Sequence, residues 1–382
     1  MKKNKYNEPL QLHRKLRGKL LVKSKIRIKT RSILSKVYTP GVAQAVKRIA
    51  QNSTDLFDLT IKSNTVAVIS DGSAVLGLGN VGAEAALPVM EGKCAIFREF
   101  AGINAFPICL NTQNSNEIVD TIKNISPVFG AINLEDISAP RCFEIEEKLK
   151  ILNIPVMHDD QHATAIVVLA GLINSAKIVN KDLKSCKIVI NGVGAAGCAI
   201  AKLLNFYGIY NLILVDSRGI INKKRNDLLP YKKDLLNISN PNNIDGDLLK
   251  AAKSSDILIG VSQKDLFTSN IIKSMALNSI VFALANPDPE VSRKNAQKWG
   301  ISIYANGRSD CRNQINNALV FPGFFKGLLK SKSRKVTNMM KVAAAQTLAS
   351  LIPHPTANRF IPSIFDKRVV PVLEKSVIQS SI

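Results

Sequence analysis

The glycine-rich turn GVGAAG at 192–197 constrains the fold of this chain more than any other feature. It follows the apolar run 187–191, and a helix-like apolar segment, 198–207, comes directly after it. A second apolar run, 212–215, ends at Asp216, about twenty positions beyond the last glycine. This order of strand, glycine turn, helix, strand and acidic residue is typical of a dinucleotide-binding unit. We therefore predict an α/β fold with a parallel sheet of the Rossmann type.

The glycines of this turn have separate expected roles. One allows the tight turn, one lets the backbone approach the pyrophosphate, and one lets the helix pack closely on the strand, with the pyrophosphate at the helix N-terminus. Asp216 would bind the adenosine ribose and favours NAD, because a carboxylate repels a 2′-phosphate, while Arg218 nearby keeps NADP possible. A second glycine run, 77–82, has the same spacing but is interrupted by leucines, so it is weak support for a nucleotide site.

Asn286 follows a later strand-like run, 279–284. Ligands of parallel sheets bind at the carboxyl ends of the strands, so Asn286 is well placed to contact nicotinamide or substrate. A simple Asn-Pro turn is the alternative. The predicted cofactor-binding residues are Gly192, Val193, Gly194, Ala195, Ala196, Gly197, Asp216 and Asn286.

Two groups of carboxylates predict a metal site. Glu135 and Asp136 follow an apolar lead-in, and Asp159 and Asp160 follow the strand-like run 154–157. Hard cations such as Mg²⁺ and Mn²⁺ take oxygen ligands and keep positions open for substrate, so carboxylates from two loops suit such a cation. Each pair taken alone also fits a structural role, in a turn or before a helix N-terminus.

A zinc site is a less favoured alternative for the same segment. His158 and His162 have the i, i+4 spacing of a zinc-protease helix. However, Asp159 stands where that motif has glutamate, and no third ligand is obvious.

Two further side chains have the chemistry of a proton donor and a proton acceptor. Tyr38 lies at a predicted strand end before a Pro-Gly turn, where a tyrosine serves as an acid or packs with its hydroxyl on backbone. Lys93 lies between a glycine and an apolar run, where desolvation would lower its pKa and make it a base near neutral pH. A surface lysine that extends its amine to solvent is the alternative for Lys93.

The formal net charge is +23, and no acidic residue occurs between Glu8 and Asp55. Such charge can attract nucleic acid or a membrane, but few aromatic residues interleave the basic ones, so we expect neither partner. Attraction of a dianionic substrate is a second explanation of the positive charge. We favour a third, that the charge reflects a composition rich in Lys, Asn and Ile throughout the chain. Apolar runs are too short to span a bilayer and the six cysteines lack Cys-x-x-Cys spacing, so we expect a cytoplasmic protein with reduced thiols.

Taken together, these segments resemble the malic enzyme family, in particular its small bacterial members. The resemblance covers nearly the whole chain, and its motifs occur in one order. They are Tyr-Thr-Pro-Gly-Val-Ala at 38–43, Ser-Asp-Gly-Ser-Ala-Val-Leu-Gly-Leu-Gly-Asn at 70–80, Pro-Val-Met-Glu-Gly-Lys at 88–93, Ile-Asn-Leu-Glu-Asp-Ile-Ser-Ala-Pro-Arg-Cys-Phe at 132–143, His-Asp-Asp-Gln-His at 158–162, Ala-Leu-Ala-Asn-Pro at 283–287 and Gly-Arg-Ser-Asp at 307–310.

The resemblance implies oxidative decarboxylation of L-malate to pyruvate and CO₂, with NAD or NADP and with Mg²⁺ or Mn²⁺. It implies a malic domain at 1–157, a Rossmann-type domain with C-terminal helices at 158–382, an active site between them, and a homo-oligomer, either dimer or tetramer. By resemblance, Tyr38 is the general acid, Lys93 is the base, and Asp159 is the residue that orients Lys93. The implied metal ligands are Glu135, Asp136 and Asp160. The implied contacts of the substrate or the nicotinamide ribose are Lys93, Asn286, Asn316 and Asn317.

Three positions depart from the family pattern. Ala163 replaces a glycine in the metal loop, Cys311-Arg312 replaces Tyr-Pro, and Ser73-Ala74 stands where larger members have an arginine that contacts malate, so another basic group must serve there. Two alternative functions remain: a malolactic activity that retains the cofactor and yields lactate, and a basic, non-catalytic nucleic-acid-binding protein with a degenerate Rossmann fold.

Overall fold

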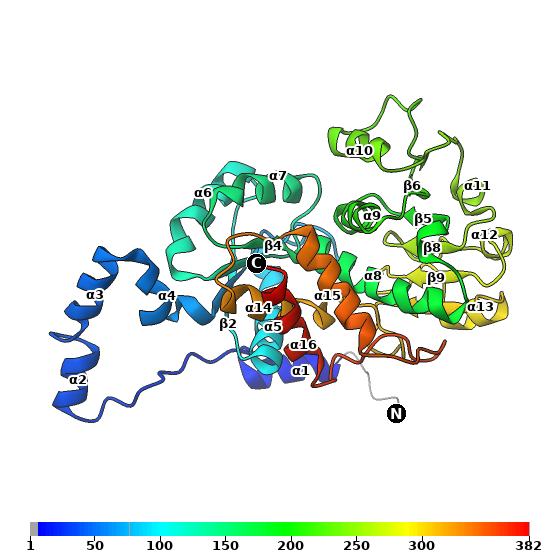
Figure 1. Ribbon diagram of the computed structural model, residues 1–382. Coiled ribbons are helices and arrows are strands. Elements are labelled where there is room, and N and C mark those ends of the chain that lie inside the picture. Colours follow the sequence, from blue (N-terminus) through cyan, green and yellow to red (C-terminus); the bar gives the residue numbers. More distant parts are fainter. Residues whose placement is uncertain (1–6, 76, 382) are drawn as a thin grey trace.

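A computed structural model describes residues 7–75 and 77–381 as an α/β structure with two parallel sheets (Figure 1). The first sheet has four strands in the order β2-β1-β3-β4. The second has six strands in the order β10-β9-β8-β5-β6-β7. Its strands are parallel except for the short edge strand β7, which pairs antiparallel with β6. The predicted α/β class is confirmed.

The first sheet is built from short apolar strands with helices between them. Its central strand β1 is buried at every residue, because it has neighbours on both edges and helices over its faces. The strands are β1 (Thr65–Ser70), β2 (Asn104–Cys109), β3 (Ala131–Leu134) and β4 (Val156–His158), and the helices are α4 (Leu56–Leu59), α5 (Ala83–Ala101), α6 (Ser115–Ile125) and α7 (Arg141–Lys148).

The second sheet begins after the long apolar helix α8, which follows β4 directly. Its strands are β5 (Ile188–Asn191), β6 (Leu212–Asp216), β7 (Gly219–Ile220), β8 (Ile257–Gly260), β9 (Ile280–Ala283) and β10 (Ile303–Asn306). Its helices are α8 (Asp159–Ile178), α9 (Ala195–Tyr207), α10 (Pro230–Asp234), α11 (Leu248–Ala252), α12 (Ser269–Ser274) and α13 (Arg293–Lys298). Short 3₁₀ turns are η1 (Ser53–Asp55), η2 (Ile61–Asn64), η3 (Ser126–Val128), η4 (Leu149–Ile151), η5 (Leu183–Ser185), η6 (Leu235–Asn237) and η7 (Asn317–Leu319).

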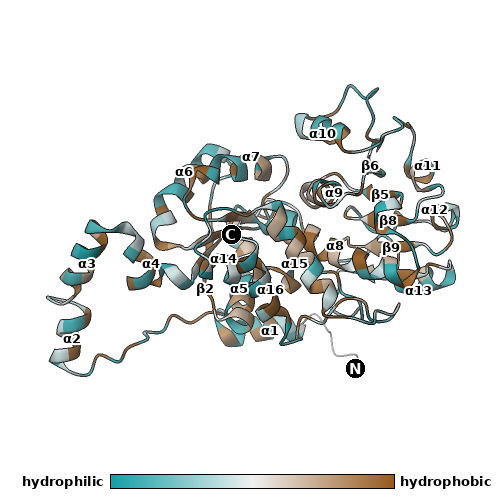
Figure 2. Ribbon diagram, in the orientation of Figure 1, coloured by the Kyte–Doolittle hydropathy of each residue, from teal (hydrophilic) through white to brown (hydrophobic). Residues whose placement is uncertain are grey.

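The first of the C-terminal helices returns to the first sheet, and the other two pack on it and on the long helix α8. The C-terminal helices are α14 (Phe321–Lys330), α15 (Asn338–Ser350) and α16 (Val369–Gln379). The ring of Phe97 in α5 lies 4.7 Å from that of Phe321 and 5.3 Å from that of Phe325 in α14, measured between centroids. One buried apolar cluster therefore includes residues of both sheets and of these helices, which Figure 2 shows as brown segments around the strands.

Part of the N-terminal segment stands apart from this core. It contains α1 (Asn7–Leu16), an exposed stretch at 20–30, α2 (Arg31–Val37) and α3 (Val42–Gln51). Both α2 and α3 lie away from the main body at the left of Figure 1. Neither α2 nor α3 has a buried residue. In the part of the chain that the structure describes, no helix is both long and apolar enough to cross a lipid bilayer.

Two local expectations about elements need correction. Tyr38 does not end a strand: it follows α2, whose start is capped by Thr30 accepting a hydrogen bond from the Ile33 backbone at 3.2 Å. Asp159 and Asp160 do not precede a helix but form the first turn of α8. The cap by Thr30 sets the start of α2, and Asp159 and Asp160 are acidic residues that a helix N-terminus stabilises. The apolar pattern alone does not show either boundary.

Candidate functional site

A cleft of about 1020 Å³ opens where the carboxyl ends of the two sheets face each other. Its lining comes from the loops after β3, β4, β5, β8 and β9, as expected for ligand sites of parallel sheets. The predicted site residues in the lining are Lys93, Glu135, Asp160, Gly194, Ala195, Ala196, Asn286, Asn316 and Asn317. One cleft thus brings together residues that are more than 200 positions apart in the sequence.

Three carboxylates converge at one end of this cleft. Glu135 and Asp136 follow β3, and Asp160 belongs to the first turn of α8. Each offers an oxygen within 4.8 Å of the other two. The backbone N–H of Asp136 donates to Asp160 Oδ2 at 2.9 Å, and Asp136 has the left-handed φ of 52°. The turn after β3 is therefore held against the start of α8.

Burial and mutual repulsion destabilise the charges of these carboxylates. Burial and the neighbouring acids raise the pKa of Asp136 to about 9. Burial raises the pKa of Glu135 to about 7 even though Lys93 opposes the shift, and burial also raises the pKa of Asp160. Asp136 Oδ2 is buried without a hydrogen-bond partner. Three clustered oxygen ligands, one of them unsatisfied, fit a hard divalent cation such as Mg²⁺ or Mn²⁺.

Lys93 is a buried member of this cluster. It extends from α5 with 7 % of its surface exposed, donates to Glu135 Oε1 at 2.8 Å and to Asp159 Oδ2, and lies 4.1 Å from the ring centroid of Phe321. The alternative of a surface lysine is therefore wrong. Asp159 is fully buried, and its Oδ1 has no partner. Asp159 contacts the lysine and is not part of the three-carboxylate group.

The expected direction of the Lys93 pKa is also wrong. Burial lowers the pKa of Lys93, but the negative charges of Asp159, Glu135 and Asp160 outweigh it and hold the pKa above its usual value. The sequence indicates the apolar setting of Lys93, and the family resemblance names Asp159 as its partner, but neither gives the combined effect of three carboxylates on the pKa of the amine. Burial correspondingly raises the pKa of Asp159 to about 7 against the opposing effect of Lys93.

Several supporting residues escaped the sequence analysis. Asn133 in β3 donates from Nδ2 to Glu135 Oε2 at 2.9 Å. Asp71 accepts hydrogen bonds from Ser73 N and Arg141 Nη2, both at 2.9 Å, and Ser73 Oγ accepts from Ser138 N at 2.9 Å. The one available signal was Asn133 itself, a polar residue inside an apolar strand and two positions before Glu135, hence on the same face.

The two histidines do not form a pair of zinc ligands. His162 Nε2 lies 2.9 Å from both carboxylate oxygens of Glu146, and His162 Nδ1 lies 2.9 Å from Lys341 Nζ. The ring of His158 is fully buried, and burial lowers its pKa to about 4. His158 and His162 therefore have different neighbours. The candidate metal ligands beside them, Glu135, Asp136 and Asp160, are all carboxylate oxygens.

The glycine turn after β5 gives its three glycines distinct surroundings. Gly192 has φ 113°, and a Cβ there would lie 2.6 Å from the Val261 carbonyl oxygen. A Cβ on Gly197 would lie 1.8 Å from the Gly192 carbonyl oxygen, so α9 starts too close to the turn for any side chain. A Cβ on Gly194 would meet nothing within 4 Å, because Gly194 faces the cleft. This geometry suits a pyrophosphate at the N-terminus of α9.

Asp216 at the end of β6 carries a cluster of basic partners. It accepts from Arg225 Nη1 at 2.7 Å, from Lys232 Nζ at 2.6 Å and from the backbone N–H of Arg218 at 3.0 Å. Burial tends to raise the pKa of Asp216, but these hydrogen bonds outweigh it and lower the pKa. Asp216 therefore stays ionised. Arg225 and Lys232 were not singled out from the sequence, because no motif links them to Asp216.

Tyr38 is a predicted catalytic residue that the chain does not bring near the cleft. It follows α2 with 66 % of its surface exposed and is not among the lining residues. The second glycine run does reach the cleft: Gly77 lies against the Asn286–Pro287 segment, where a Cβ would come 2.5 Å from Pro287 Cδ. Its role there is close packing beside Asn286.

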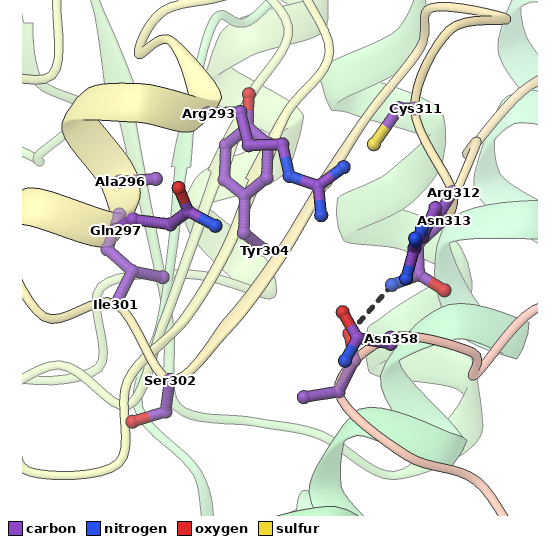
Figure 3. A pocket seen from close by; sticks show the side chains of 11 residues that line it. Arg293, Ala296, Gln297, Ile301, Ser302, Tyr304, Cys311, Arg312, Asn313 and Asn358 are labelled. Carbon is purple, nitrogen blue, oxygen red and sulfur yellow. Dashed lines mark hydrogen bonds between the residues drawn. The ribbon is translucent and has the colours of Figure 1, made fainter.

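The departures from the family pattern occupy different places. Ala163 is fully buried inside α8, where its methyl group belongs to the apolar core. Ala74 lines the cleft. Cys311 and Arg312 line a separate cavity of about 110 Å³, shown in Figure 3, where the neighbouring Asn313 donates to the Ala357 carbonyl at 2.8 Å.

Comparisons with known proteins agree with the geometry. Residues 162–373 match the family model "Malic enzyme, NAD binding domain", and residues 16–118 and 112–150 match "Malic enzyme, N-terminal domain". The chain is 49% identical to the NAD-dependent malic enzyme of Geobacillus stearothermophilus over 95% of its own length and 77% of the relative. It is 47% identical to the bifunctional malic/malolactic enzyme of Bacillus subtilis, over 98% and 92%. The crystal structure of an NAD-dependent malic enzyme from Thermotoga maritima superposes with a TM-score of 0.94 at 43% identity, over 97% and 99%.

Proposed function

The chain belongs to the malic enzyme family of NAD(P)-dependent oxidoreductases, and we propose that it converts L-malate to pyruvate and CO₂ while reducing NAD, with a divalent cation held by Glu135, Asp136 and Asp160. One observation carries the proposal. Buried Lys93 contacts the carboxylate cluster in the same cleft that the glycine turn of α9 enters. A base, cation ligands and a dinucleotide turn thus share one cleft.

Lys93 would take the proton of the malate hydroxyl on C2. Asp159 holds the amine in place through its hydrogen bond, so a single nitrogen position faces the cleft. A cation on the three carboxylates would offset their charge and so bring the pKa of Lys93 back toward that of a base. When bound, the cation supplies Lewis-acid polarisation of the substrate oxygens, and the nicotinamide accepts the hydride from C2.

Oxidation at C2 gives oxaloacetate, in which the new C2 ketone is β to the far carboxylate, so that this carboxylate can leave as CO₂. The electron pair of the broken bond remains on C3 as an enolate, and Tyr38 would donate a proton to C3 to give pyruvate. Asn286, Asn316 and Asn317 line the cleft and would bind a substrate carboxylate or the nicotinamide ribose. Backbone N–H groups at Ala195 and Ala196 would hold the pyrophosphate.

Tyr38 would act in the cleft of a second copy of the chain. Its flanking helices α2 and α3 have no buried residue and expose Leu34, Val42 and Val46, as expected of a surface that another chain covers. A substrate with two carboxylates also needs positive charge in the cleft. Among the lining residues of the described chain, Lys93 is the sole lysine or arginine. A partner segment that carries Tyr38 and Lys36 would supply both an acid and a cation for the far carboxylate. A homodimer is thus the smallest active unit.

NAD is the proposed cofactor. The carboxylate of Asp216 stands at the end of β6, where the adenosine ribose binds in dinucleotide folds, and it would accept a hydrogen bond from the ribose 2′-hydroxyl of NAD. The relative from G. stearothermophilus is named NAD-dependent, whereas relatives from Rickettsia prowazekii and Rhizobium meliloti at 40% and 39% identity are named NADP-dependent.

We also propose a cytoplasmic location, no nucleic-acid partner and a division between a malic domain at 1–157 and a cofactor domain at 158–382. The division is supported by the two sheets, because the chain passes from the first sheet toward the second at the β4–α8 junction. The location is supported by the identity to bacterial malic enzymes.

The test is absorbance at 340 nm of purified protein with L-malate and Mn²⁺, run in parallel with NAD and NADP. We expect reduced NAD and an equal amount of pyruvate, and loss of both in Lys93→Ala. Correctly folded protein that reduces neither cofactor would overturn the proposal.

A malolactic activity is the second candidate, because one relative is named a bifunctional malic/malolactic enzyme. It would give lactate from malate without net reduction of NAD. Lactate measured in the same reaction distinguishes the two outcomes.

A further inference from the structure

A second cavity, of about 570 Å³, lies beside the start of α8 and shares no lining residue with the cleft. Its walls come from α7, from the first turns of α8, from α9, from the loop at 334–336 and from α15. It therefore touches both α8, whose first turn contains Asp160, and α9, whose N-terminus faces the cofactor side of the cleft. The volume suits a small organic ligand.

The lining of this cavity has an excess of positive charge. Two acidic residues line it: Glu146, which is bound to His162, and Glu147, which pairs with Lys150. Lys202, Arg334, Lys335 and Lys341 also line it, and none of them forms an ion pair with a carboxylate in the described part of the chain. These unpaired cations come from three different segments, so the charge converges on the cavity and does not follow one helix face.

Lys341 is the buried member of this group. It is 8 % exposed, and an ammonium group has three N–H donors, yet its hydrogen-bond partner in the structure is His162 Nδ1 at 2.9 Å. Burial lowers the pKa of Lys341 to about 8; Glu146 opposes the shift, while Lys150 and Lys202 add to it. An anion in the cavity would accept the remaining N–H groups and offset this cost.

We propose that this cavity binds a small multiply charged anion with phosphate or carboxylate groups, held by Lys341 at its buried wall and by Arg334 and Lys335 at its rim. Arginine presents a planar fork that matches both groups, and lysines add charge without fixed geometry. Bound there, the anion connects α15 with the α8 turn that carries His162, two residues after Asp160. The cavity is a ligand site separate from the one for malate and NAD.

The test is isothermal titration calorimetry of the full chain with fructose 1,6-bisphosphate and, separately, with tricarballylate. Each titration is run with Mg²⁺ plus either NADH or L-malate at saturation, conditions without turnover. We expect one anion per chain, undisturbed by NADH or L-malate. Binding of the bisphosphate alone identifies a phosphate ligand, and binding of tricarballylate alone a carboxylate ligand.

Matched charge variants decide where the anion binds. Arg334→Gln/Lys335→Gln should weaken binding at least about tenfold, because two charge-assisted contacts are lost. Lys294→Gln/Lys298→Gln on α13 removes the same charge from an exposed helix and should leave binding unchanged. Lys341→Met should abolish binding, and if it does not fold, the rim variant still decides.

Three results would overturn the proposal: neither anion binds, both variant pairs weaken binding equally, or L-malate or NADH displaces the anion. The readout is binding and requires no turnover, so it stands even if the proposed malate activity fails.

Discussion

Asp136 is the least stable charge in the carboxylate cluster, since its Oδ2 is buried and unpartnered beside Glu135 and Asp160. Asp136→Asn should therefore keep or increase the thermal stability of chelator-treated protein and remove its response to Mg²⁺. For the parent protein, Mg²⁺ at 100 times its dissociation constant should add about 2.7 kcal/mol to the free energy of unfolding. Thermal denaturation with and without chelator measures both effects.

The control for this prediction is Asp120→Asn, an exposed carboxylate on α6. It should respond to Mg²⁺ as the parent protein does. Equal stabilisation of Asp136→Asn by Mg²⁺ would show that the three carboxylates do not hold the cation.

Lys341 should make stability depend on pH in the alkaline range. Its pKa is about 8 in the folded protein and 10.5 in the unfolded chain, so the unfolded state binds more protons between these values. The free energy of unfolding should thus rise with pH from about 8 to 10.5, by about 3 kcal/mol from this group, and this gain is lost as pH falls through 8. Urea denaturation of parent and Lys341→Met at pH 7.5 and 10.5 measures the difference in slope.

Lys298→Met is the control for the pH dependence, because Lys298 is exposed on α13. It should retain the full slope of the parent protein. A slope unchanged by Lys341→Met would mean that Lys341 keeps an ordinary pKa in the folded protein.

The geometry of the turn between β5 and α9 depends on glycine, whose side chain is a single hydrogen atom. Gly197→Ala would place a Cβ 1.8 Å from the Gly192 carbonyl oxygen, so α9 must move away from β5. We expect the free energy of unfolding to fall by about 3 kcal/mol or more, as for other severe steric substitutions. Chemical denaturation measures the loss.

Gly194→Ala is the matched variant in the same turn, since a Cβ there meets nothing within 4 Å. Its stability should change by less than about 0.5 kcal/mol, while NADH binding, followed by fluorescence, should weaken because the methyl group faces the pyrophosphate. Equal stability of the two variants would contradict the packing role of Gly197.

At this scale the sequence predicts elements well and their boundaries less well. The β5–turn–α9–β6 unit was predictable because its glycines, apolar runs and Asp216 lie within about thirty residues and follow one pattern. Tyr38 was placed at a strand end, although Thr30 starts a helix that reaches Val37. Helix caps act over three residues, so a period-based interpretation of an apolar run misses them.

The whole molecule adds contacts that no local pattern contains. Lys93 meets Asp159 across 66 positions, and the Lys341 amine meets His162 across 179. The sequence therefore identifies Lys93 and the carboxylates as candidates by residue type and by resemblance. It predicts a lowered pKa for Lys93, whereas the neighbouring carboxylates raise it. The cavity that Lys341 lines was likewise invisible, because its cations come from separate segments.

A second copy of the chain should complete each cleft with its Tyr38. Tyr38→Phe and Lys93→Ala, each inactive alone, should recover activity when unfolded together and refolded. A mixed dimer then has one cleft with both Lys93 and Tyr38, so random pairing predicts about a quarter of the parent activity from the two-site arithmetic. Malate-dependent reduction of NAD measures the recovery.

Mixing Lys93→Ala with Tyr210→Phe serves as the control, because Tyr210 is similarly exposed, at 68 %, but lies in the loop between α9 and β6. Tyr210→Phe alone should keep full activity. No recovery in the Tyr38→Phe mixture, from protein shown to be dimeric by sedimentation, would mean that Tyr38 serves the cleft of its own chain.

The return of α14 to the first sheet has a consequence for synthesis on the ribosome. Lys93 lies over the ring of Phe321, and Phe97 packs between Phe321 and Phe325, so the wall behind the base consists of residues translated more than two hundred codons later. The first sheet and α5 emerge early, but Lys93 stays exposed to water until α14 covers it. The nascent chain therefore has an open, unfinished base site until the residues of α14 have been added.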